Sequence, residues 1–335
     1  MSRSITIGCL FLLGLLYPSD RSDGKSNRWS REPEGLAAAI RENNSQPVLR
    51  EFLDSDVTLR LKLAQLDYIN VQRKKHGVKP LQYDVVAGRV MQSHIAEMTQ
   101  ARSFAHQNRN GEYAFHRFAK SGRTDHVQEN LFAVFTTGVY QRSNEEFASK
   151  MREGVDAFLA EIPPNDGHRK ALLDPNATHV GIGFAQANDD QSFRYGELFV
   201  HKYVELARPP VCLTSRDTLE IIGRMIDLEY GPYAFFGYWT PPLKTPSRAD
   251  TFTDKPYFDG SSDAVIQRWP WDFQNYKPLG ETFSLRIPLH GIQPGLIYGV
   301  LHVKNQISTI PYRIGGKATS EGTVSAGAIV IEIIE

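Results

Sequence analysis

Hydrophobic residues in the first half of the chain recur every three or four positions, which is the spacing of a helix with one buried face. Polar residues that can cap a helix N-terminus stand before several of these stripes, and glycine or proline follows several of them. Helical segments are predicted from this pattern over residues 34–43, 46–56, 55–77, 84–102, 114–120 and 145–162.

Alternating hydrophobic and polar positions, the period of a half-buried β-strand, follow after residue 178. HVGIGFAQA and FRYGELFVHKYVEL are predicted to pair as antiparallel strands around a turn at residues 188–190. Beyond residue 207 the strand-like runs are GPYAFFGYW, ETFSLRIPL, GLIYGVLHVK and GAIVIEIIE, and helical spacing remains only in residues 215–226. This order predicts an α+β fold, in which a layered first domain precedes an all-β, Ig-like sandwich.

The expected domain organisation follows from changes in composition. Arg3 stands before an apolar run at residues 5–17. This is the pattern of a signal peptide, and it is shorter than the ~20 apolar residues of a transmembrane helix. A retained N-terminal anchor is the alternative. We expect a signal peptide in residues 1–20, a polar tether with short helices in 21–57, the layered domain in 58–207 and the sandwich in 208–335. The mature chain would be secreted or periplasmic, without a transmembrane span.

Charge and cysteine content narrow the classes of partner. The 38 Lys and Arg residues balance the 38 Asp and Glu residues, so the formal net charge is zero. We therefore expect no recognition of nucleic acid, or of an anionic membrane, by bulk charge. Cys9 and Cys212 are the two cysteines of the chain. Removal of a signal peptide would leave Cys212 alone, without an intrachain disulfide.

Five short segments carry a specific resemblance. They are, in chain order, LDYINVQRKKHGVKPLQYD, MQSHIAEMTQARSFAH, QENL, VDAFLAEI and GHRKALLDPNATHVGIGFA. Each is weak alone, but together and in this order they make residues 59–206 resemble a CAP domain, the domain of cysteine-rich secretory proteins, venom allergens and plant pathogenesis-related proteins. The chain is similar to the bacterial extracellular branch of this family. The resemblance implies an α-β-α sandwich for the first domain.

The resemblance also implies a pocket built from two histidines and two glutamates. The family's four positions correspond to His106, Glu129, Glu161 and His168 of this sequence. The chain departs from many eukaryotic members, because it lacks their disulfides and has Arg169 where an aromatic residue often follows the second histidine. These departures put eukaryotic activities in doubt for this chain.

The chemistry of such a tetrad follows from its side chains. Two neutral imidazoles, His106 and His168, are good ligands for Zn²⁺ or another divalent cation. Glu129 and Glu161 would accept the other ring N–H groups and so fix the tautomers, or one of them would act as a general base. Without a metal, the four residues would form a hydrogen-bonded network that catalyses nothing. Two protein ligands are fewer than the three of most catalytic zinc sites, which disfavours an enzyme.

We therefore expect a binding or interaction module with an ion-capable groove and an unidentified extracellular or envelope ligand: a protein, a peptidoglycan or other sugar, or a lipid. A metal-dependent, peptidase-like hydrolase and a lipid or sterol carrier are the alternatives. Trp239, Trp269 and Trp271 of the second domain can stack on sugars, although sandwich cores also use aromatic residues.

Histidines outside the tetrad are expected to have other roles. His94 lies on an apolar stripe and is interpreted as a core histidine bonded to the backbone. His116 and His126 are expected in loops, at the groove rim or in solvent.

Overall fold

A computed structural model of the chain describes residues 35–135, 143–187, 192–244, 269–271, 282–305 and 322–335. The expected signal peptide and the expected turn at residues 188–190 lie outside these residues. No helix of the described part is long and apolar enough to cross a membrane.

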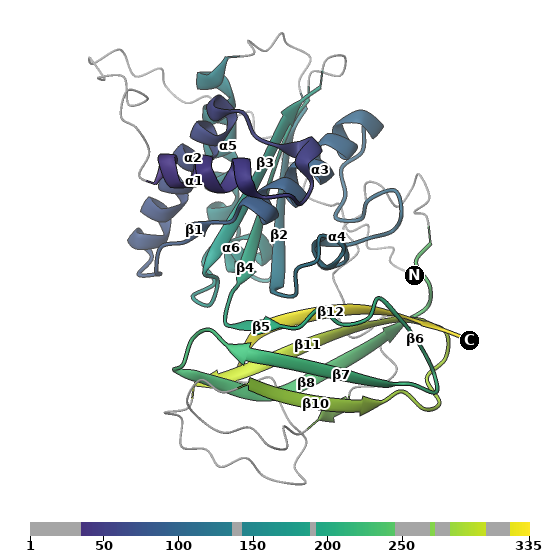
Figure 1. The fold of residues 1–335 in the computed structure, drawn as a ribbon. Helices are drawn as coiled ribbons and strands as arrows, with labels where there is room; N and C mark the ends of the chain where they lie inside the picture. Colours follow the sequence, from purple (N-terminus) through teal and green to yellow (C-terminus); the bar gives the residue numbers. More distant parts are fainter. Residues whose placement is uncertain (1–34, 136–142, 188–191, 245–268, 272–281, 306–321) are drawn as a thin grey trace, which may run out of the picture.

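The first unit is a four-stranded sheet between two layers of helices (Figure 1). The strands are β1 (Gln82–Tyr83), β2 (His126–Val134), β3 (His179–Gln186) and β4 (Phe193–His201), in the order β1-β3-β4-β2. The helices are α1 (Leu36–Ser45), α2 (Asp56–Lys75), α3 (Val85–Ala101), α4 (Ala114–Lys120), α5 (Asn144–Ala160) and α6 (Gly167–Leu172). Strands β3 and β4 are antiparallel, as predicted.

Two apolar clusters hold the sheet between its helices. Buried residues of α1, α2, α5 and α6 pack with one face of β3 and β4. Buried residues of α3 and α4 pack with β2 and the other face of β4. The glycines of β3 lie beneath α3, where a Cβ at Gly181 or Gly183 would overlap the helix backbone. The α-β-α layering and the α+β fold class predicted from the sequence are therefore confirmed.

The second unit consists of two sheets packed on a shared core. One sheet has the order β6-β12-β11-β8-β9 and the other β10-β7-β5. Their strands are β5 (Val204–Leu206), β6 (Cys212–Thr214), β7 (Thr218–Met225), β8 (Tyr230–Thr240), β9 (Trp269–Trp271), β10 (Thr282–Pro288), β11 (Gly295–Asn305) and β12 (Val324–Ile334). Leu219, Ile221, Phe283 and Leu285 face inward from β7 and β10, in the strict alternation of a half-buried strand.

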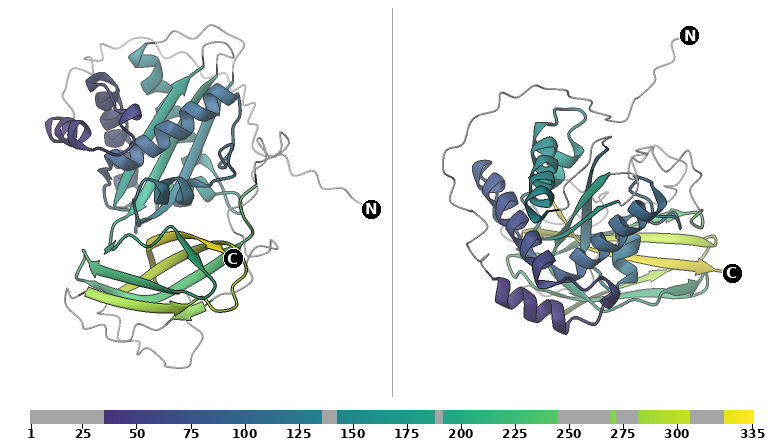
Figure 2. Two further views of the ribbon diagram at one scale, coloured as in Figure 1. Left: turned by 45° about the vertical axis from the view of Figure 1, so that its right-hand side comes forward. Right: turned by 90° about the horizontal axis from the view of Figure 1, so that it is seen from above.

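The two units meet along β12, which lies across one end of the first sheet (Figures 1 and 2). The Ala328 N–H donates to the Thr124 carbonyl at 2.7 Å, and Asp125 forms a bridge with Gly327. The ring of Tyr298 packs on that of Phe115, with centroids 4.0 Å apart. One apolar cluster therefore contains residues of both units.

Two predicted helices are wrong. Within residues 46–55 the only helical turn is a 3₁₀ turn at Arg50–Phe52, because Leu49 has a φ of 49° and interrupts the α conformation. Residues 215–226 contain β7, in which Leu219 and Ile221 point inward and Ile222 is exposed. The segment predicted as one strand, residues 193–206, forms β4 and β5, which belong to different sheets.

Candidate functional site

The four residues of the expected tetrad come from four different parts of the first unit. His106 lies in the loop after α3, and Glu129 is in β2. Glu161 directly follows the last residue of α5, and His168 is in α6. The imidazole rings of His106 and His168 face each other with centroids 6.4 Å apart and planes 23° from parallel. The structure therefore brings the tetrad together.

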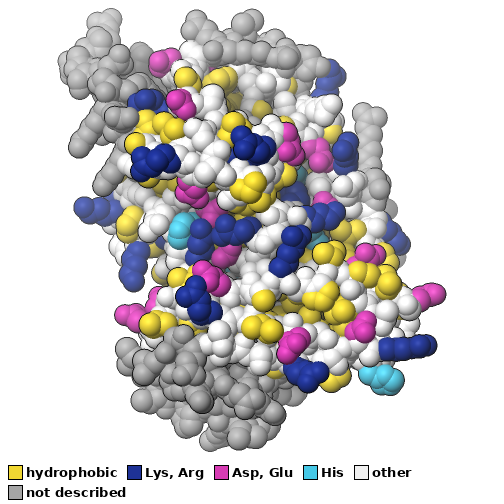
Figure 3. All heavy atoms as spheres, viewed as in Figure 1, with side chains coloured by type: hydrophobic (Ala, Val, Ile, Leu, Met, Phe, Trp, Pro, Cys, Tyr) yellow, Lys and Arg dark blue, Asp and Glu magenta, His cyan; other side chains and the backbone are white. Residues whose placement is uncertain are grey.

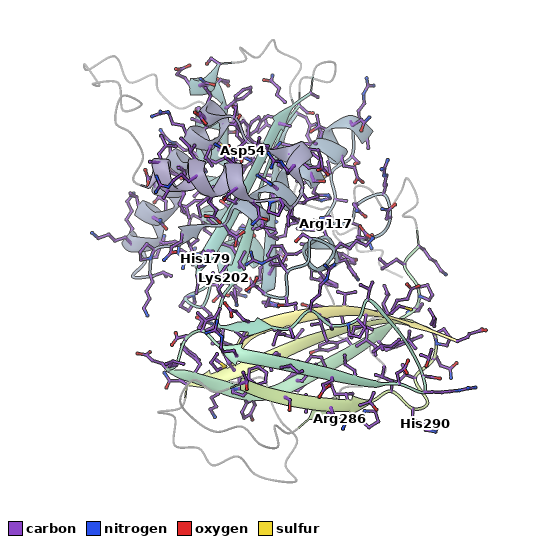
Figure 4. All side chains as sticks on the ribbon, in the orientation of Figure 1. Asp54, Arg117, His179, Lys202, Arg286 and His290 are labelled. Atoms are coloured by element: carbon purple, nitrogen blue, oxygen red, sulfur yellow. The ribbon has the colours of Figure 1, made fainter. Side chains whose placement is uncertain are left out.

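The first half of the site is held by Arg117 of α4 (labelled in Figure 4). His106 Nδ1 donates to Glu129 Oε1 at 2.9 Å. Arg117 Nη2 donates to the other oxygen of the same carboxylate, and its Nη1 donates to the His106 carbonyl at 2.8 Å and to the Glu112 carbonyl at 2.7 Å. One guanidinium thus fixes both the histidine backbone and its carboxylate.

Glu129 is ionised in this arrangement. Its side chain is 0 % exposed, and burial alone would raise its pKa. The positive charge of Arg117 and the hydrogen bond from His106 outweigh burial and lower the pKa of Glu129 to about 2. A carboxylate with so low a pKa is a weak base, so its role is to accept the His106 N–H.

The second half of the site is more open. His168 Nδ1 donates to Glu161 Oε1 at 2.5 Å, and the Arg169 N–H donates to Glu161 Oε2 at 3.1 Å. The His168 ring stacks on Phe158, with centroids 5.0 Å apart. Burial would raise the pKa of Glu161, but the bonds from His168 and the backbone lower it below its ordinary value. The Glu161 side chain keeps 18 % exposure, against 0 % for Glu129.

The donor set fits a weak cation site. Because Nδ1 of each histidine donates to a carboxylate, Nε2 carries the lone pair in each neutral ring. Two imidazoles on one tetrahedral ion, with metal–nitrogen distances of about 2.0–2.1 Å, have centroids roughly 5 Å apart. The observed 6.4 Å would require the rings of His106 and His168 to approach by about 1 Å. Among the described residues, no three His, Cys, Asp or Glu side chains are grouped to hold a metal.

A buried polar network next to the tetrad, formed by Asn130, Glu197 and Tyr195, was not predicted from the sequence. Asn130 Nδ2 donates to the His168 carbonyl at 2.9 Å and to Glu197 Oε2 at 3.2 Å. Glu197 is 0 % exposed and also accepts the Tyr195 hydroxyl at 2.6 Å. Burial raises the pKa of Glu197 to about 7. Asn130 was visible in the QENL segment, whereas nothing in the apolar strand around Glu197 distinguished that residue.

The other histidines have structural positions. His94 is buried and donates to the Ala105 carbonyl at 2.9 Å, which confirms its interpretation as a core histidine. His116 lies in the helix predicted over residues 114–120, but its expected exposure to solvent is wrong, and the expected loop position of His126 is wrong as well. His116 is buried in α4, where its Nδ1 accepts the Tyr113 N–H, and burial lowers its pKa to about 3. His126 opens β2 at the contact with the second unit.

Comparisons with known proteins agree with the motifs. A family model described as the cysteine-rich secretory protein family, CAP, matches residues 66–203. Two Bacillus subtilis proteins are similar in sequence: the uncharacterized protein YkwD is 25% identical over 122 residues, and the uncharacterized membrane protein YlbC is 28% identical over 128 residues. These matches cover 36% and 38% of this chain, and only 41% and 32% of the two relatives.

Two solved structures are also similar. An outer surface protein of Borrelia burgdorferi is 19% identical, with a TM-score of 0.33, over 41% of this chain and 89% of that one. An extracellular protein with an SCP domain from Bacillus anthracis is 22% identical, with a TM-score of 0.32, over 42% of this chain and 40% of that one. The family model and the ordered motifs are the basis of the assignment: residues 66–203 form a domain of the CAP, or cysteine-rich secretory protein, family.

Proposed function

We propose that this chain is an exported binding module whose CAP domain holds a divalent cation between Nε2 of His106 and Nε2 of His168. The observation that carries the proposal is the pair of neighbouring imidazoles, with centroids 6.4 Å apart, each with its Nδ1–H on a carboxylate. A carboxylate in that position fixes the tautomer and raises the basicity of the metal-binding nitrogen. Water, or groups of an extracellular ligand, would complete the coordination.

The charges at the site favour a cation. The negative charge of Glu129 is balanced by Arg117, which contacts it directly. Glu161 has only His168 as an ion-pair partner among the described residues. With both histidines neutral, the four residues and Arg117 therefore carry one net negative charge. The two positive charges of a divalent ion would more than offset this negative charge, without displacing either Nδ1 hydrogen bond.

Metal titration of the full chain tests this proposal. We expect Zn²⁺ to bind at one equivalent in isothermal titration calorimetry, and His106→Ala or His168→Ala each to weaken binding at least about tenfold, because each removes one of two protein ligands. His290→Ala is the matched control, since His290 is an exposed histidine far from the site (Figure 4). Equal metal content and affinity in the wild type and both site variants would remove the cation from the proposal.

The hydrolase alternative now rests on one carboxylate. Glu129 is a poor general base because Arg117 keeps its pKa at about 2. Glu161 is partly exposed and is the remaining candidate. A metal-dependent peptidase would show chelator-sensitive cleavage of peptide substrates that Glu161→Gln abolishes while the fold is kept. Cleavage that persists in Glu161→Gln would exclude this role for the tetrad.

Export and the nature of the ligand are part of the proposal. Arg3 and the apolar run at residues 5–17 support a secreted or periplasmic location. The ligand would then be an extracellular or envelope protein, sugar or lipid. A lipid or sterol carrier needs an apolar cavity, and the cavity described below lies between the two units rather than at the tetrad.

A further inference from the structure

Strand β2 is an outer strand of the first sheet (Figure 1), and the tetrad is built around it. Among the described strands, β2 pairs along its length with β4 on one side only. It supplies Glu129, whereas His106 comes from the layer of α3 and α4, and His168 comes from the layer of α5 and α6. The outer edge of β2, the side away from β4, therefore lies beside the proposed cation site.

The hydrogen bonds of the sheet determine which backbone groups point to this outer edge. The Ala187 N–H donates to the Ser192 carbonyl, so odd-numbered residues of β3 bond to even-numbered residues of β4. Odd-numbered residues of β4 then bond to β2, where their partners are even-numbered. Glu129, Leu131 and Ala133 consequently direct their N–H and C=O groups to the outer edge. No described residue bonds to these backbone groups there.

The backbone at this edge is accessible beside the two histidines. Glu129 as a whole is 8 % exposed, although its side chain is 0 % exposed. The exposed part of this residue is therefore its main chain. Ala133 is partly exposed as well. The side chains of His106 and His168 are 19 % and 31 % exposed, so one ligand can reach both the edge and the rings.

An extended peptide has the groups that match this edge. The three outward residues are spaced two apart, and a second strand presents its own N–H and C=O groups at the same interval of about 6.6 Å. In β-strand addition, such main-chain hydrogen bonds supply the affinity for a peptide. A sugar or a lipid has no such repeat of donors and acceptors. Of the three ligand classes left open above, the edge therefore favours a protein.

The two imidazoles limit how far this peptide can extend. The ring centroids of His106 and His168 are 6.4 Å apart. This gap has room for an ion and its small ligands, but not for a backbone that carries side chains. A peptide paired with Leu131 and Ala133 would therefore end near Glu129. With a divalent ion bound, the site carries one net positive charge, and a terminal carboxylate is a suitable ligand for the open positions of the ion.

The cleft between the two units is a separate feature. It has a volume of about 720 Å³ and is lined by α4, the ends of β11 and β12 and the linker that follows β5. Its lining contains both basic and acidic residues, and none of the four tetrad residues. On the face drawn in Figure 3, basic and acidic side chains are interspersed along the junction of the two units. The charge of this cleft therefore favours no class of ligand.

We propose that the CAP domain binds the C-terminal tail of a partner protein, which adds to the outer edge of β2 and places its terminal carboxylate on the cation held by His106 and His168. Leu131 and Ala133 supply the backbone groups that pair with the tail. The tail runs antiparallel to β2, because its C-terminus lies at the Glu129 end. This inference rests on the proposed cation site and deepens it by naming the class of ligand.

Peptide selection on the full chain tests the proposal. The probe is a random heptapeptide library displayed with free C-terminal carboxylates and selected in the presence of Zn²⁺. The best binder is synthesised with a fluorophore at its N-terminus and measured by fluorescence anisotropy. We expect amidation of its C-terminus, or removal of Zn²⁺ with EDTA, to weaken binding at least about tenfold, because each removes one partner of the carboxylate–ion pair.

Strand pairing is tested separately by N-methylation of single peptide amides. A methyl group should weaken binding about tenfold at alternate positions, where the amide donates to the edge, and should have little effect at the positions between. Ala133→Pro should weaken binding to a similar degree, because it removes an N–H from the outer edge. Proline is tolerated where the sheet does not use that N–H. Ala133→Ser keeps the N–H and is the matched control.

The outcomes distinguish this inference from the cation site itself. Calorimetric binding of Zn²⁺ without any selected peptide would overturn the inference and leave the cation site in place, whereas absence of Zn²⁺ binding would overturn both. Peptides that bind regardless of their terminal carboxylate, of Zn²⁺ and of Ala133→Pro would overturn the inference. A dimer of this chain that Ala133→Pro dissociates, and that no selected peptide displaces, would also overturn it by assigning the edge to a second copy.

Discussion

Arg117 forms hydrogen bonds to two members of the tetrad, His106 and Glu129, whereas each tetrad side chain is bonded to one other member. Its side chain is only 8 % exposed, and it bonds to Glu129, to the backbone of His106 and to the backbone of Glu112. The planar guanidinium can serve these acceptors together, which the single ammonium of a lysine cannot. At the residue scale, the site therefore depends on a side chain outside the four that the family resemblance indicates.

Loss of Arg117 should destabilise the first unit strongly. Arg117→Ala leaves the buried charge of Glu129 without its cation, and we expect the free energy of unfolding to fall by about 3–5 kcal/mol. Arg117→Lys should cost less but should still disorder His106. Urea denaturation of both variants checks this, with Arg216→Ala as an exposed control. If the free energy of unfolding of Arg117→Ala falls by less than about 1 kcal/mol, the contacts of Arg117 with Glu129 and His106 are not a significant source of stability.

Glycines in the central strands determine how closely the helices approach the sheet. A Cβ at Gly181 would overlap the backbone of Ala87 and Gly88 in α3. The alternation in HVGIGFAQA already indicated that small residues share one face of this strand. At the element scale, small residues are required on that face of β3 because α3 packs directly on it.

Gly181→Ala should therefore destabilise the protein by about 3 kcal/mol, since backbone atoms of a helix cannot move aside as a flexible side chain can. Gly167→Ala is the matched control, because a Cβ there meets no atom within 4 Å. Thermal unfolding by circular dichroism measures both. Similar melting temperatures for the two variants would mean that α3 can shift away from the sheet at little cost.

Elements with a clear period were the ones that the sequence could predict. The long helices α2, α3 and α5 lie where their stripes and caps indicate, with Ser55, Asp84 and Ser143 accepting the capping N–H groups. Strand β2 was missed because Gln128, Glu129 and Asn130 interrupt its alternation.

The same polar residues of β2 form hydrogen bonds with residues distant in sequence, and such contacts cannot be predicted from a local sequence pattern. The tetrad was found through ordered motifs of the family. Arg117 and Glu197 were not found, because their roles depend on neighbours distant in sequence.

Histidines gather where the two units meet. The His126 and His201 rings lie 5.1 Å apart, and the Tyr298 hydroxyl is 3.4 Å from His126 Nδ1. His201 contacts the Ser325 carbonyl at 2.9 Å and Asp174 at 3.2 Å. Burial, and then the neighbouring histidines, lower the pKa of His126 well below its ordinary value of 6.5. At the scale of the whole molecule, contact between the units therefore favours uncharged His126.

Acid should weaken this contact. A histidine whose pKa is lowered by folding leaves the free energy of unfolding unchanged above its unfolded pKa of about 6.5. Below that pH, the free energy of unfolding falls by up to about 1.4 kcal/mol per pH unit. We expect the wild type to lose more stability between pH 7.5 and pH 5.0 than His126→Gln does. Other buried histidines titrate in both proteins, so the difference between them isolates His126. Denaturant unfolding at the two pH values measures it, with His290→Gln as control, and equal losses would contradict the prediction.

The apolar cluster that contains residues of both units limits how the chain can be divided. Tyr298, Val300 and Ala328 of the second unit pack with Phe115 and Phe118 of the first. A fragment that ends after β4 would expose the first unit's part of this cluster to water, and a fragment that begins after β4 would expose the second unit's part. Each piece would be prone to aggregate when expressed alone, so work on the CAP domain needs both units together or a redesigned junction surface.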